Sequence, residues 1–192
     1  MARTIEFNEE DAIKKAMDVF WKKGYNGASM RDLTSAMQIN SSSLYNTIGD
    51  KHALFVRGIK YYTESRIEEA KKRAANEKSP LTALINFIND AVTFITNGET
   101  TCMAVKTAFE VAPDDDSIKA ILKADNDFTH IFVRSLIEKA RKLGEMQEDE
   151  DPEVLTDYII SAYTGWYESY ILHKDPIRIT KMARYLVAQL KQ

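Results

Sequence analysis

The spacing of its apolar residues limits what this chain can fold into more than any other feature. Near the start, Ala12, Ile13, Ala16, Met17 and Phe20 recur every three or four positions, which places them on one face of a helix. Similar periods continue to the end of the sequence, and we find no candidate strand. Only 7 Gly and 4 Pro occur among the 192 residues, too few for the many turns of an all-β fold. We therefore predict an all-α protein of about nine helices.

Short polar residues mark where the first three helices begin. Asn8 is a candidate cap for the first helix, and Ser29 with Asp32 three residues later resembles a capping box. Ser41 or Ser42 is placed to cap a short third helix.

A long fourth helix separates two domains. Asp50 is its predicted cap, and the helix continues over about residues 51–75, before the break at residues 76–80. We predict an N-terminal helix-turn-helix domain at 1–55 and a C-terminal helical domain at 76–192, joined by this connecting helix.

The segment 29–48 has the plan of a helix-turn-helix, with two short helices joined by a turn of three or four residues. The second short helix is written SSSLYNT, and its hydroxyl and amide groups are of the kind that bind phosphates and base edges. Arg31, in the first turn of the preceding helix, is placed to reach the DNA backbone or a base. Lys51 lies at the start of the fourth helix, where its charge and the helix amides can bind another phosphate.

The charge of the chain is unevenly distributed. Residues 1–75 carry 13 Lys and Arg against 10 Asp and Glu, whereas residues 76–192 carry 13 against 19. The net charge of −3 therefore conceals a positive N-terminal region. This asymmetry is modest, but it favours a phosphate-binding surface in the N-terminal domain.

The stretch from Phe20 to Phe55 resembles the N-terminal pattern of the TetR/AcrR family of transcriptional regulators; it reads FWKKGYNGASMRDLTSAMQINSSSLYNTIGDKHALF. The matching features are an aromatic pair before K-G-Y, then S-M-R-D-L, S-S-L-Y, and G-D-K before a leucine. The resemblance implies a regulator, most often a repressor, that binds a palindromic double-stranded DNA operator as a homodimer. It also implies a C-terminal ligand-binding and dimerisation domain, and release from DNA by a small organic effector.

The resemblance assigns seven residues to the DNA surface. They are Ser41, Ser42, Tyr45 and Thr47 on the recognition helix, Ser29 and Arg31 at the entry of the preceding helix, and Lys51 at the start of the fourth.

Two positions depart from the family pattern. Gln38 stands in the turn where the family usually has Gly, so a positive φ there would leave Gln38 mildly strained. Ile48 stands where the family prefers Phe, which we interpret as a change of packing.

Aromatic residues are numerous in the C-terminal domain. A generic core explains most of them, but a cavity lined by aromatic rings and a few polar groups would explain the excess. Because these segments are neither strongly basic nor strongly acidic, we expect a neutral or amphipathic organic ligand. The candidate lining residues are Phe87, Phe94, Phe109, Phe128, Tyr163 and Trp166.

The last two helices have the features of an interface. One carries a stripe of small residues that lets another helix approach closely, and the other carries a broad apolar face. The family resemblance implies that both pair with their copies as a four-helix dimer. The candidate interface residues are Ala162, Gly165, Ser169, Met182, Leu186 and Leu190.

We expect no catalytic residues, metal site or cofactor. The sequence has no Gly-rich phosphate loop, nucleophile elbow or HExxH pattern, and its three His are isolated from other ligand types. The single Cys102 cannot form an internal disulfide, which fits a reducing cytoplasm. With no basic residue within three positions, Cys102 is more typical of a buried structural thiol than of a redox sensor.

No apolar run approaches the roughly 18 residues of a membrane span, and the first residues lack a signal core, so we expect a cytoplasmic protein. Bulk properties alone also allow a helical protein-interaction adaptor that does not bind DNA. That alternative does not account for SSSLYNT followed by GDK.

Overall fold

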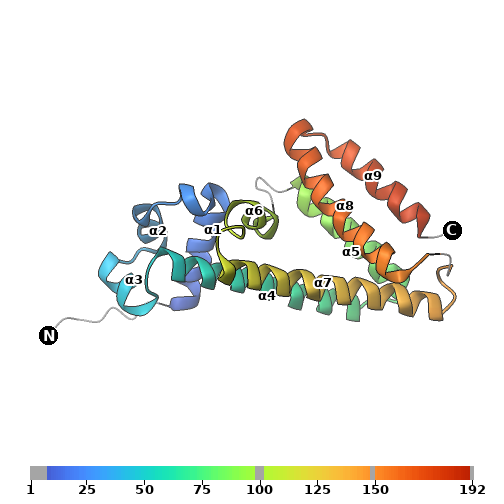
Figure 1. Ribbon diagram of the computed structural model, residues 1–192, viewed down its shortest axis with the longest axis horizontal. Coiled ribbons are helices and arrows are strands. Elements are labelled where there is room, and N and C mark those ends of the chain that lie inside the picture. The colour runs from blue at the N-terminus through green and yellow to red at the C-terminus, as the bar shows by residue number, and fades with distance from the viewer. Residues whose placement is uncertain (1–7, 98–101, 148–149, 191–192) are drawn as a thin grey trace. The chain divides into compact units, whose positions relative to one another are not determined.

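The computed structural model describes residues 8–97, 102–147 and 150–190, and all regular secondary structure within them is α-helical. The predicted all-α fold of about nine helices is confirmed. None of the described helices is long and apolar enough to cross a membrane. The helices (Figure 1) are α1 (Glu9–Gly27), α2 (Met30–Met37), α3 (Ser41–Thr47), α4 (Lys51–Ala75), α5 (Pro80–Asn97), α6 (Met103–Glu110), α7 (Asp116–Lys142), α8 (Pro152–His173) and α9 (Pro176–Gln189).

Side-chain caps fix where the first two helices begin, as predicted. Oδ1 of Asn8 accepts a hydrogen bond from the amide of Asp11 at 3.0 Å. Oγ of Ser29 accepts from the amide of Asp32 at 3.1 Å, and the Asp32 carboxylate accepts from the amide of Ser29 at 3.0 Å. This reciprocal pair is a capping box, and it satisfies two amides that have no partner within the helix.

The predicted cap of α3 is wrong by one residue. Asn40, rather than Ser41 or Ser42, precedes the helix in an extended conformation, and its Oδ1 accepts from the amide of Ser43 at 2.7 Å. Asn is as strong a capping residue as Ser, so the helix begins one residue earlier. Ser41 and Ser42 are consequently the first two residues of α3, and both are exposed.

The chain forms two compact units, and each consists of two stretches of sequence. The first unit comprises Met1–Glu64 and Met103–Leu122, and the second comprises Ser65–Cys102 and Lys123–Gln192. Helices α4 and α7 therefore contribute residues to both units. The boundary that we predicted at residue 76 divides the chain only once and does not anticipate that α6 belongs with the N-terminal helices.

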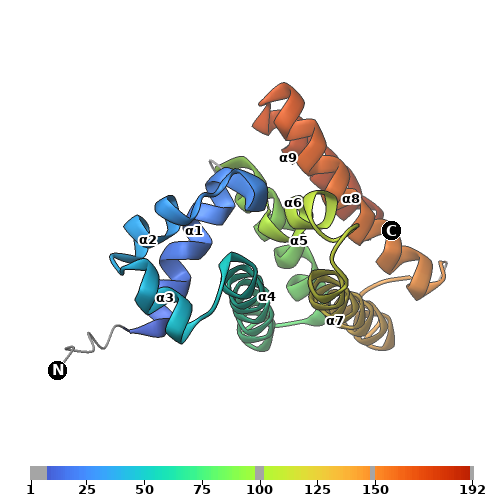
Figure 2. The same ribbon diagram turned by 60° about the vertical axis from the view of Figure 1, so that its left-hand side comes forward.

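An aromatic and aliphatic core holds the first unit together. The rings of Phe20 and Phe55 meet edge to face with their centroids 4.9 Å apart, and Tyr25 lies 4.7 Å from Phe55. Leu33 of α2 and Leu44 of α3 are completely buried. Figure 2 shows α1, α2 and α3 grouped together. Each of the two short helices is therefore held by an apolar side chain on one face, while its other face can contact a partner.

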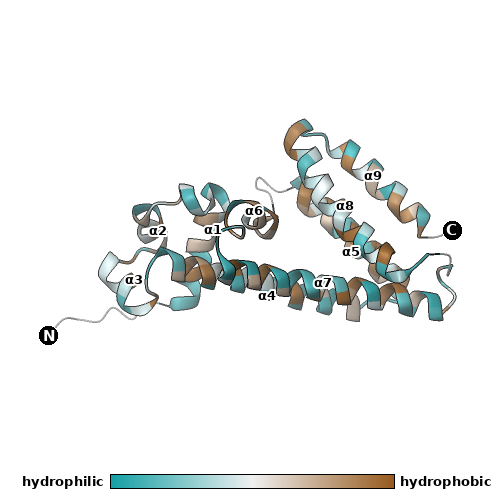
Figure 3. Ribbon diagram, viewed as in Figure 1, coloured by the Kyte–Doolittle hydropathy of each residue, from teal (hydrophilic) through white to brown (hydrophobic). Residues whose placement is uncertain are grey.

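The second unit has a core of its own. Helices α5, α8 and α9 contact one another, and each buries an isoleucine completely, namely Ile88, Ile159 and Ile179. The C-terminal part of α7 adds Ile137 to the buried residues. In Figure 3 these helices carry both apolar and polar residues, as expected for amphipathic helices around one core.

The turn between α2 and α3 contains a left-handed residue. Gln38 has φ 58° and ψ 36°, which is the positive φ under which we expected mild strain at this position. The Gln38 amide donates to the carbonyl of Ser35, and the Ile39 amide donates to the carbonyl of Thr34. These hydrogen bonds satisfy carbonyls at the end of α2. The left-handed conformation that they require is sterically unfavourable for a residue with a β-carbon, such as Gln38.

We expect Gln38→Gly to stabilise the protein by about 1 kcal/mol, because glycine adopts a positive φ without a steric penalty. Urea unfolding of the wild type and the variant measures this difference. Gln38→Ala is the matched control, since alanine keeps the β-carbon and should give no gain. Equal stability of the glycine and alanine variants would contradict the prediction.

Candidate DNA-binding surface

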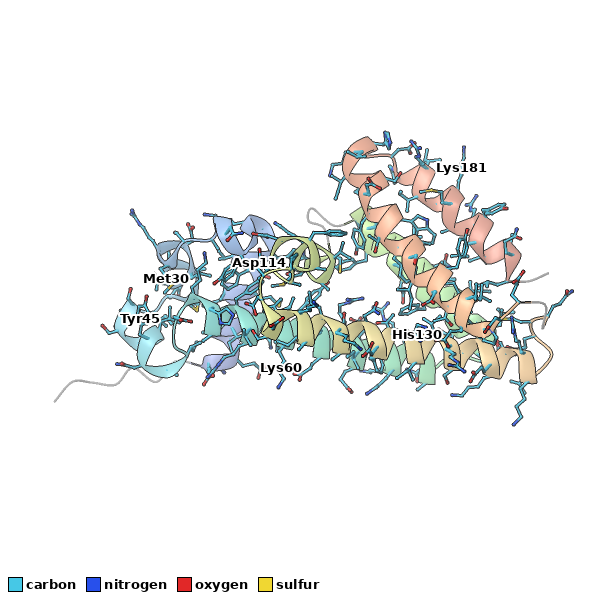
Figure 4. The ribbon with its side chains drawn as sticks, in the orientation of Figure 1. Met30, Tyr45, Lys60, Asp114, His130 and Lys181 are labelled. Atoms are coloured by element: carbon cyan, nitrogen blue, oxygen red, sulfur yellow. The ribbon has the colours of Figure 1, made fainter. Side chains whose placement is uncertain are left out.

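Helix α3 divides its side chains between the core and solvent. Leu44 is 0% exposed and Ile48, directly after the helix, is 5% exposed, whereas Tyr45 is 53% exposed. Ser41 and Ser42 are exposed and lie four and three positions before Tyr45, so the three side chains share one helix face. Thr47 is also exposed. Tyr45 is labelled on α3 in Figure 4. The structure therefore presents all four predicted residues of the recognition helix to solvent.

The two predicted residues at the entry of α2 differ in their surroundings. The Ser29 hydroxyl donates to the Asp32 carboxylate at 2.7 Å while it accepts from the Asp32 amide, so it is engaged in the cap. Asp32 also pairs with Lys23 at 2.7 Å, and this hydrogen bond, with those from Ser29, holds the pKa of the Asp32 carboxyl far below its usual range. Arg31 is exposed, and no residue in the described part of the chain forms an ion pair with it. Its guanidinium is therefore available to an anionic partner.

Lys51 is held in place at the first residue of α4. Its Nζ lies 4.6 Å from the centroid of the Tyr25 ring, a cation–π distance. Tyr25 in turn packs on Phe55 in the core of the first unit. Oδ1 of Asp50 caps the helix by accepting from the amide of Ala53 at 2.8 Å, as predicted. The core therefore restricts where the Lys51 charge lies at the start of α4.

Helix α6 contacts the end of α1 through a carboxylate that the sequence did not identify. Gly24 interrupts α1 with φ 76° and ψ 169°, and Oε1 of Glu110 accepts from the amide of Asn26 at 2.9 Å. The positive φ favours glycine at this position, and a β-carbon there would also lie 2.6 Å from Oε2 of Glu110. Lys106 adds a second link by donating to the carbonyl of Trp21 at 3.3 Å. Figure 1 shows α6 beside α1.

A further polar contact joins α4 to the start of α7. Nε2 of His52 lies 2.7 Å from Oδ2 of Asp115. Asp115 also accepts hydrogen bonds from the Ser117 hydroxyl and the Ile118 amide, which caps α7. These hydrogen bonds, that from the Ser117 hydroxyl foremost, and then the contact with His52, lower the pKa of the Asp115 carboxyl to about 2.

We expect the ionised Asp115 carboxylate to stabilise the first unit in a pH-dependent way. Its pKa is lowered in the folded state, so its contribution is complete above about pH 4, the ordinary pKa of Asp, and is lost as the pH falls through about 2. Asp115→Asn should therefore be less stable than the wild type at pH 6, and the two should converge towards pH 2. Unfolding followed at both pH values measures this, with the exposed neighbour Asp114→Asn as the control. A stability difference that does not change with pH would contradict the prediction.

In the second unit, four of the six predicted ligand-contacting aromatics belong to one group of ring contacts. Phe87 lies 5.5 Å from Phe132 and 5.9 Å from Tyr163, Phe128 lies 5.9 Å from Phe132, and Tyr163 lies 5.5 Å from Trp166. We call Phe87, Phe128, Phe132, Tyr163 and Trp166 the aromatic cluster. Phe132 was not among the lining residues predicted from the sequence.

The other two predicted aromatics are more exposed than the rings of the cluster. Phe94 of α5 is 38% exposed, and Phe109 of α6 is 74% exposed. Phe109 also belongs to the first unit, whereas the cluster belongs to the second.

An ion pair between an exposed arginine and a buried aspartate of the second unit was not predicted from the sequence. Nη1 of Arg66 lies 3.5 Å from Oδ2 of Asp125, and the same nitrogen lies 4.0 Å from Sγ of the buried Cys102. Asp125 is 8% exposed although it is a carboxylate. Its position three residues before Phe128, on the apolar face of α7, is the signal that could have identified it.

The predicted interface residues are not equally available to a second copy. Leu186 and Leu190 are buried within the chain, whereas Ala162, Ser169 and Met182 are partly exposed. Gly165 is exposed, and no described atom lies within 4 Å of the point where its β-carbon would be. Large apolar side chains that are exposed on the same two helices include Tyr158, Ile171, Leu172, Ile177 and Tyr185.

Comparison with known proteins gives matches along most of the chain. The model of the tetR family of bacterial regulatory proteins matches residues 12–57, and the model of the tetracyclin repressor-like C-terminal domain matches residues 80–186. The uncharacterized HTH-type transcriptional regulator YezE of Bacillus subtilis (strain 168) is 28% identical over 163 residues, which are 83% of this chain and 84% of that protein. The HTH-type transcriptional repressor DhaR of Mycobacterium sp. (strain GP1) is 24% identical over 86% of this chain and 82% of its own length.

Solved structures share the fold. A cysteine mutant of the TetR family regulator CifR, complexed with a 26-bp double-strand operator DNA, has a TM-score of 0.84 and 23% identity, covering 98% of this chain and 99% of that one. A TetR family regulator from Agrobacterium tumefaciens has a TM-score of 0.86 at 16% identity, covering 95% and 97%.

The buried face of α3, its exposed polar face and the capped turn before it define a helix-turn-helix DNA-binding protein with a separate helical domain. The two family models between them account for both domains. This chain belongs to the TetR family of bacterial transcriptional regulators, which are DNA-binding proteins rather than enzymes.

Proposed function

We propose that this regulator is a repressor that binds a palindromic operator as a homodimer and is released by a small organic effector. The observation that carries the proposal is the division of α3, which buries Leu44 and exposes Ser41, Ser42 and Tyr45. Arg31 and Lys51 supply positive charge on the neighbouring helices of the same unit. The proposed operator has half-sites about one helical turn apart, roughly 34–36 Å, because one recognition helix comes from each copy. Such DNA is in the cytoplasm, where we expect the protein to act.

Helix α4 supports the effector-controlled part of the proposal. It begins with Lys51 in the first unit and contributes Arg66, which pairs with Asp125, to the second. One continuous helix therefore carries residues of the proposed DNA surface and of the proposed effector site. An effector that shifts this helix would lower DNA affinity by about 5- to 150-fold, the usual range of allosteric coupling.

The proposal is tested by titrating the purified protein with DNA from upstream of its own coding sequence, in the presence of non-specific competitor and at several salt concentrations. Specific binding should survive the competitor and should weaken steeply with salt. If the protein does not bind that DNA specifically, selection from random duplexes identifies an operator located elsewhere. Failure in the selection as well would overturn the repressor and favour a protein-interaction adaptor.

For the dimer, we propose that the exposed faces of α8 and α9 pair with their copies. Tyr158, Gly165 and Leu172 are spaced by seven residues on α8, so they lie on one helix face. Glycine at the centre lets a second helix approach closely, and the flanking side chains supply apolar area. In this arrangement, the buried Leu186 and Leu190 do not contact the second copy but pack α9 against the core of their own chain.

We expect Gly165→Leu to weaken dimerisation at least about 10-fold while the chain still folds. The two leucines would overlap at the interface or hold the helices apart, which should make the free energy of dimerisation less favourable by about 1.4 kcal/mol or more. The open space around position 165 accommodates the new side chain within one chain. Analytical ultracentrifugation measures the dimer, and Thr93→Leu, on the exposed face of α5, is the control. An unchanged dimer would place the interface elsewhere.

A further inference from the structure

The aromatic cluster combines rings that are partly exposed to solvent with one that is buried. Phe87, Phe128 and Phe132 are half-buried, whereas Trp166 is only 5% exposed. Phe87 and Phe132 meet edge to face, and Phe128 and Phe132 are stacked. An additional aromatic ring can pack against the faces or the edges of these rings. The half-buried rings therefore offer an apolar, aromatic surface to a planar molecule.

The Tyr163 hydroxyl lies within this cluster without a hydrogen-bond partner. Its oxygen is buried, and no described residue donates to it or accepts from it. Burial raises the pKa of this phenol, an effect that the nearby Arg66 charge only partly opposes, so the group stays protonated and acts as a donor. A buried donor left unpaired is costly, and nearly all such groups in proteins have partners. The hydroxyl therefore favours a ligand that carries an acceptor.

The charged groups beside the cluster balance one another. The Arg66 cation is paired with Asp125, whose side chain is 10% exposed, while the Arg66 side chain is 41% exposed and reaches solvent. A further cation, Lys71, lies 5.2 Å from the Phe128 centroid, is exposed on α4 and pairs with Glu68 at 3.2 Å. A charged ligand beside Tyr163 would lose its hydration without gaining an unpaired partner of opposite charge.

We infer that the aromatic cluster binds an uncharged aromatic molecule whose oxygen or nitrogen acceptor takes the hydrogen bond of the Tyr163 hydroxyl. The inference rests on the proposed function in treating this cluster as the effector site, and it names the chemical class of the effector. The ring of the ligand lies against the half-buried phenylalanines, and its acceptor points towards Tyr163. A carbonyl attached to a single aromatic ring meets both requirements.

Trp166 provides the readout, because its ring lies 5.5 Å from that of Tyr163. In a Trp21→Phe background it is the single tryptophan, since the chain has only 2 Trp. The probes are acetophenone, ethylbenzene, benzoate and benzylamine, which share one ring and differ in acceptor and charge. Acetophenone should change the Trp166 fluorescence saturably and bind about tenfold more tightly than ethylbenzene, the effect of one hydrogen bond to a buried donor. The anion and the cation should both bind more weakly than acetophenone.

Tyr163→Phe tests the role of the hydroxyl. It should abolish the preference for acetophenone over ethylbenzene without lowering the melting temperature, because the hydroxyl it removes has no partner in the described chain. Tyr158→Phe, an exposed tyrosine on the same helix, is the control and should leave the preference intact. Equal binding of acetophenone and ethylbenzene to the wild type, or tighter binding of benzoate, overturns the inference.

The same probes separate this inference from the proposed function. Fluorescence reports ligand class whether or not DNA is bound, whereas release from the operator is measured in the DNA titration. Binding of acetophenone without release supports the ligand class and contradicts the effector mechanism. Release from DNA that persists in Tyr163→Phe with an unchanged ligand preference supports the mechanism and overturns the assignment of the hydroxyl.

Discussion

Tyr45→Ala should lower the affinity for operator DNA at least about 100-fold while changing the free energy of unfolding by less than about 0.5 kcal/mol. The side chain is 53% exposed, so its removal leaves no cavity. A hydrogen bond to a phosphate contributes about 1.5–3 kcal/mol, and a dimer makes this contact twice, which corresponds to a factor of about 100 or more. Tyr45→Phe separates the hydroxyl from the ring, and should lose most of the same affinity if the hydroxyl binds phosphate.

Lys51→Ala supplies an independent readout of the same surface. Each phosphate contact contributes about 0.9 to the slope of log affinity against log salt, so removing one lysine from each copy should make the slope shallower by about 2. Lys60→Ala is the matched control, because Lys60 is an exposed lysine on the same helix (Figure 4) that lies 3.8 Å from Glu64. An unchanged slope in Lys51→Ala, or an equal change in Lys60→Ala, would remove Lys51 from the DNA surface.

The helix-turn-helix was predictable because the residues that form it are close together in the sequence. The capping box of Ser29 and Asp32, the strain at Gln38 and the inward face of α3 all depend on residues within a few positions of one another. Even the error at the α3 cap arose locally, from the choice between Asn40 and the serine beside it, which cap helices about equally well.

The contacts within each unit that sequence reasoning missed join residues far apart in the chain. The Glu110 carboxylate and the Asn26 amide are separated by 84 residues, and Arg66 and Asp125 by 59. The position of Asp125 on the apolar face of α7 indicates a buried carboxylate, but no period or cap identifies Arg66 as its partner, or the Asn26 amide as that of Glu110. Only the fold brings them together.

The dimer interface is difficult to predict from an apolar period. A broad apolar face on the last helix indicates that something covers it, but the period does not distinguish the chain's own core from a second copy. The structure buries Leu186 in the core, whereas Tyr185, its neighbour in sequence, is 65% exposed. The exposed face of α9, which carries Tyr185, therefore differs from the apolar face that the period identifies.

Leu44→Ala should destabilise the protein by about 3 kcal/mol and abolish operator binding, although no DNA contact is removed. The side chain is 0% exposed, and truncating a buried leucine costs about 2.7–5 kcal/mol from lost burial and the cavity left behind. Helix α3 has seven residues, too few to be stable alone, so its position depends on Leu44 and Ile48.

Two measurements separate this effect from that of Tyr45→Ala. Urea unfolding should show the loss of stability, and amide hydrogen exchange should show that residues 43–48 open before the rest of the first unit. Ser42→Ala, at an exposed neighbouring position, should change neither. If Leu44→Ala were as stable as Ser42→Ala, α3 would not depend on its buried face, and that face would not be what orients Tyr45 towards DNA.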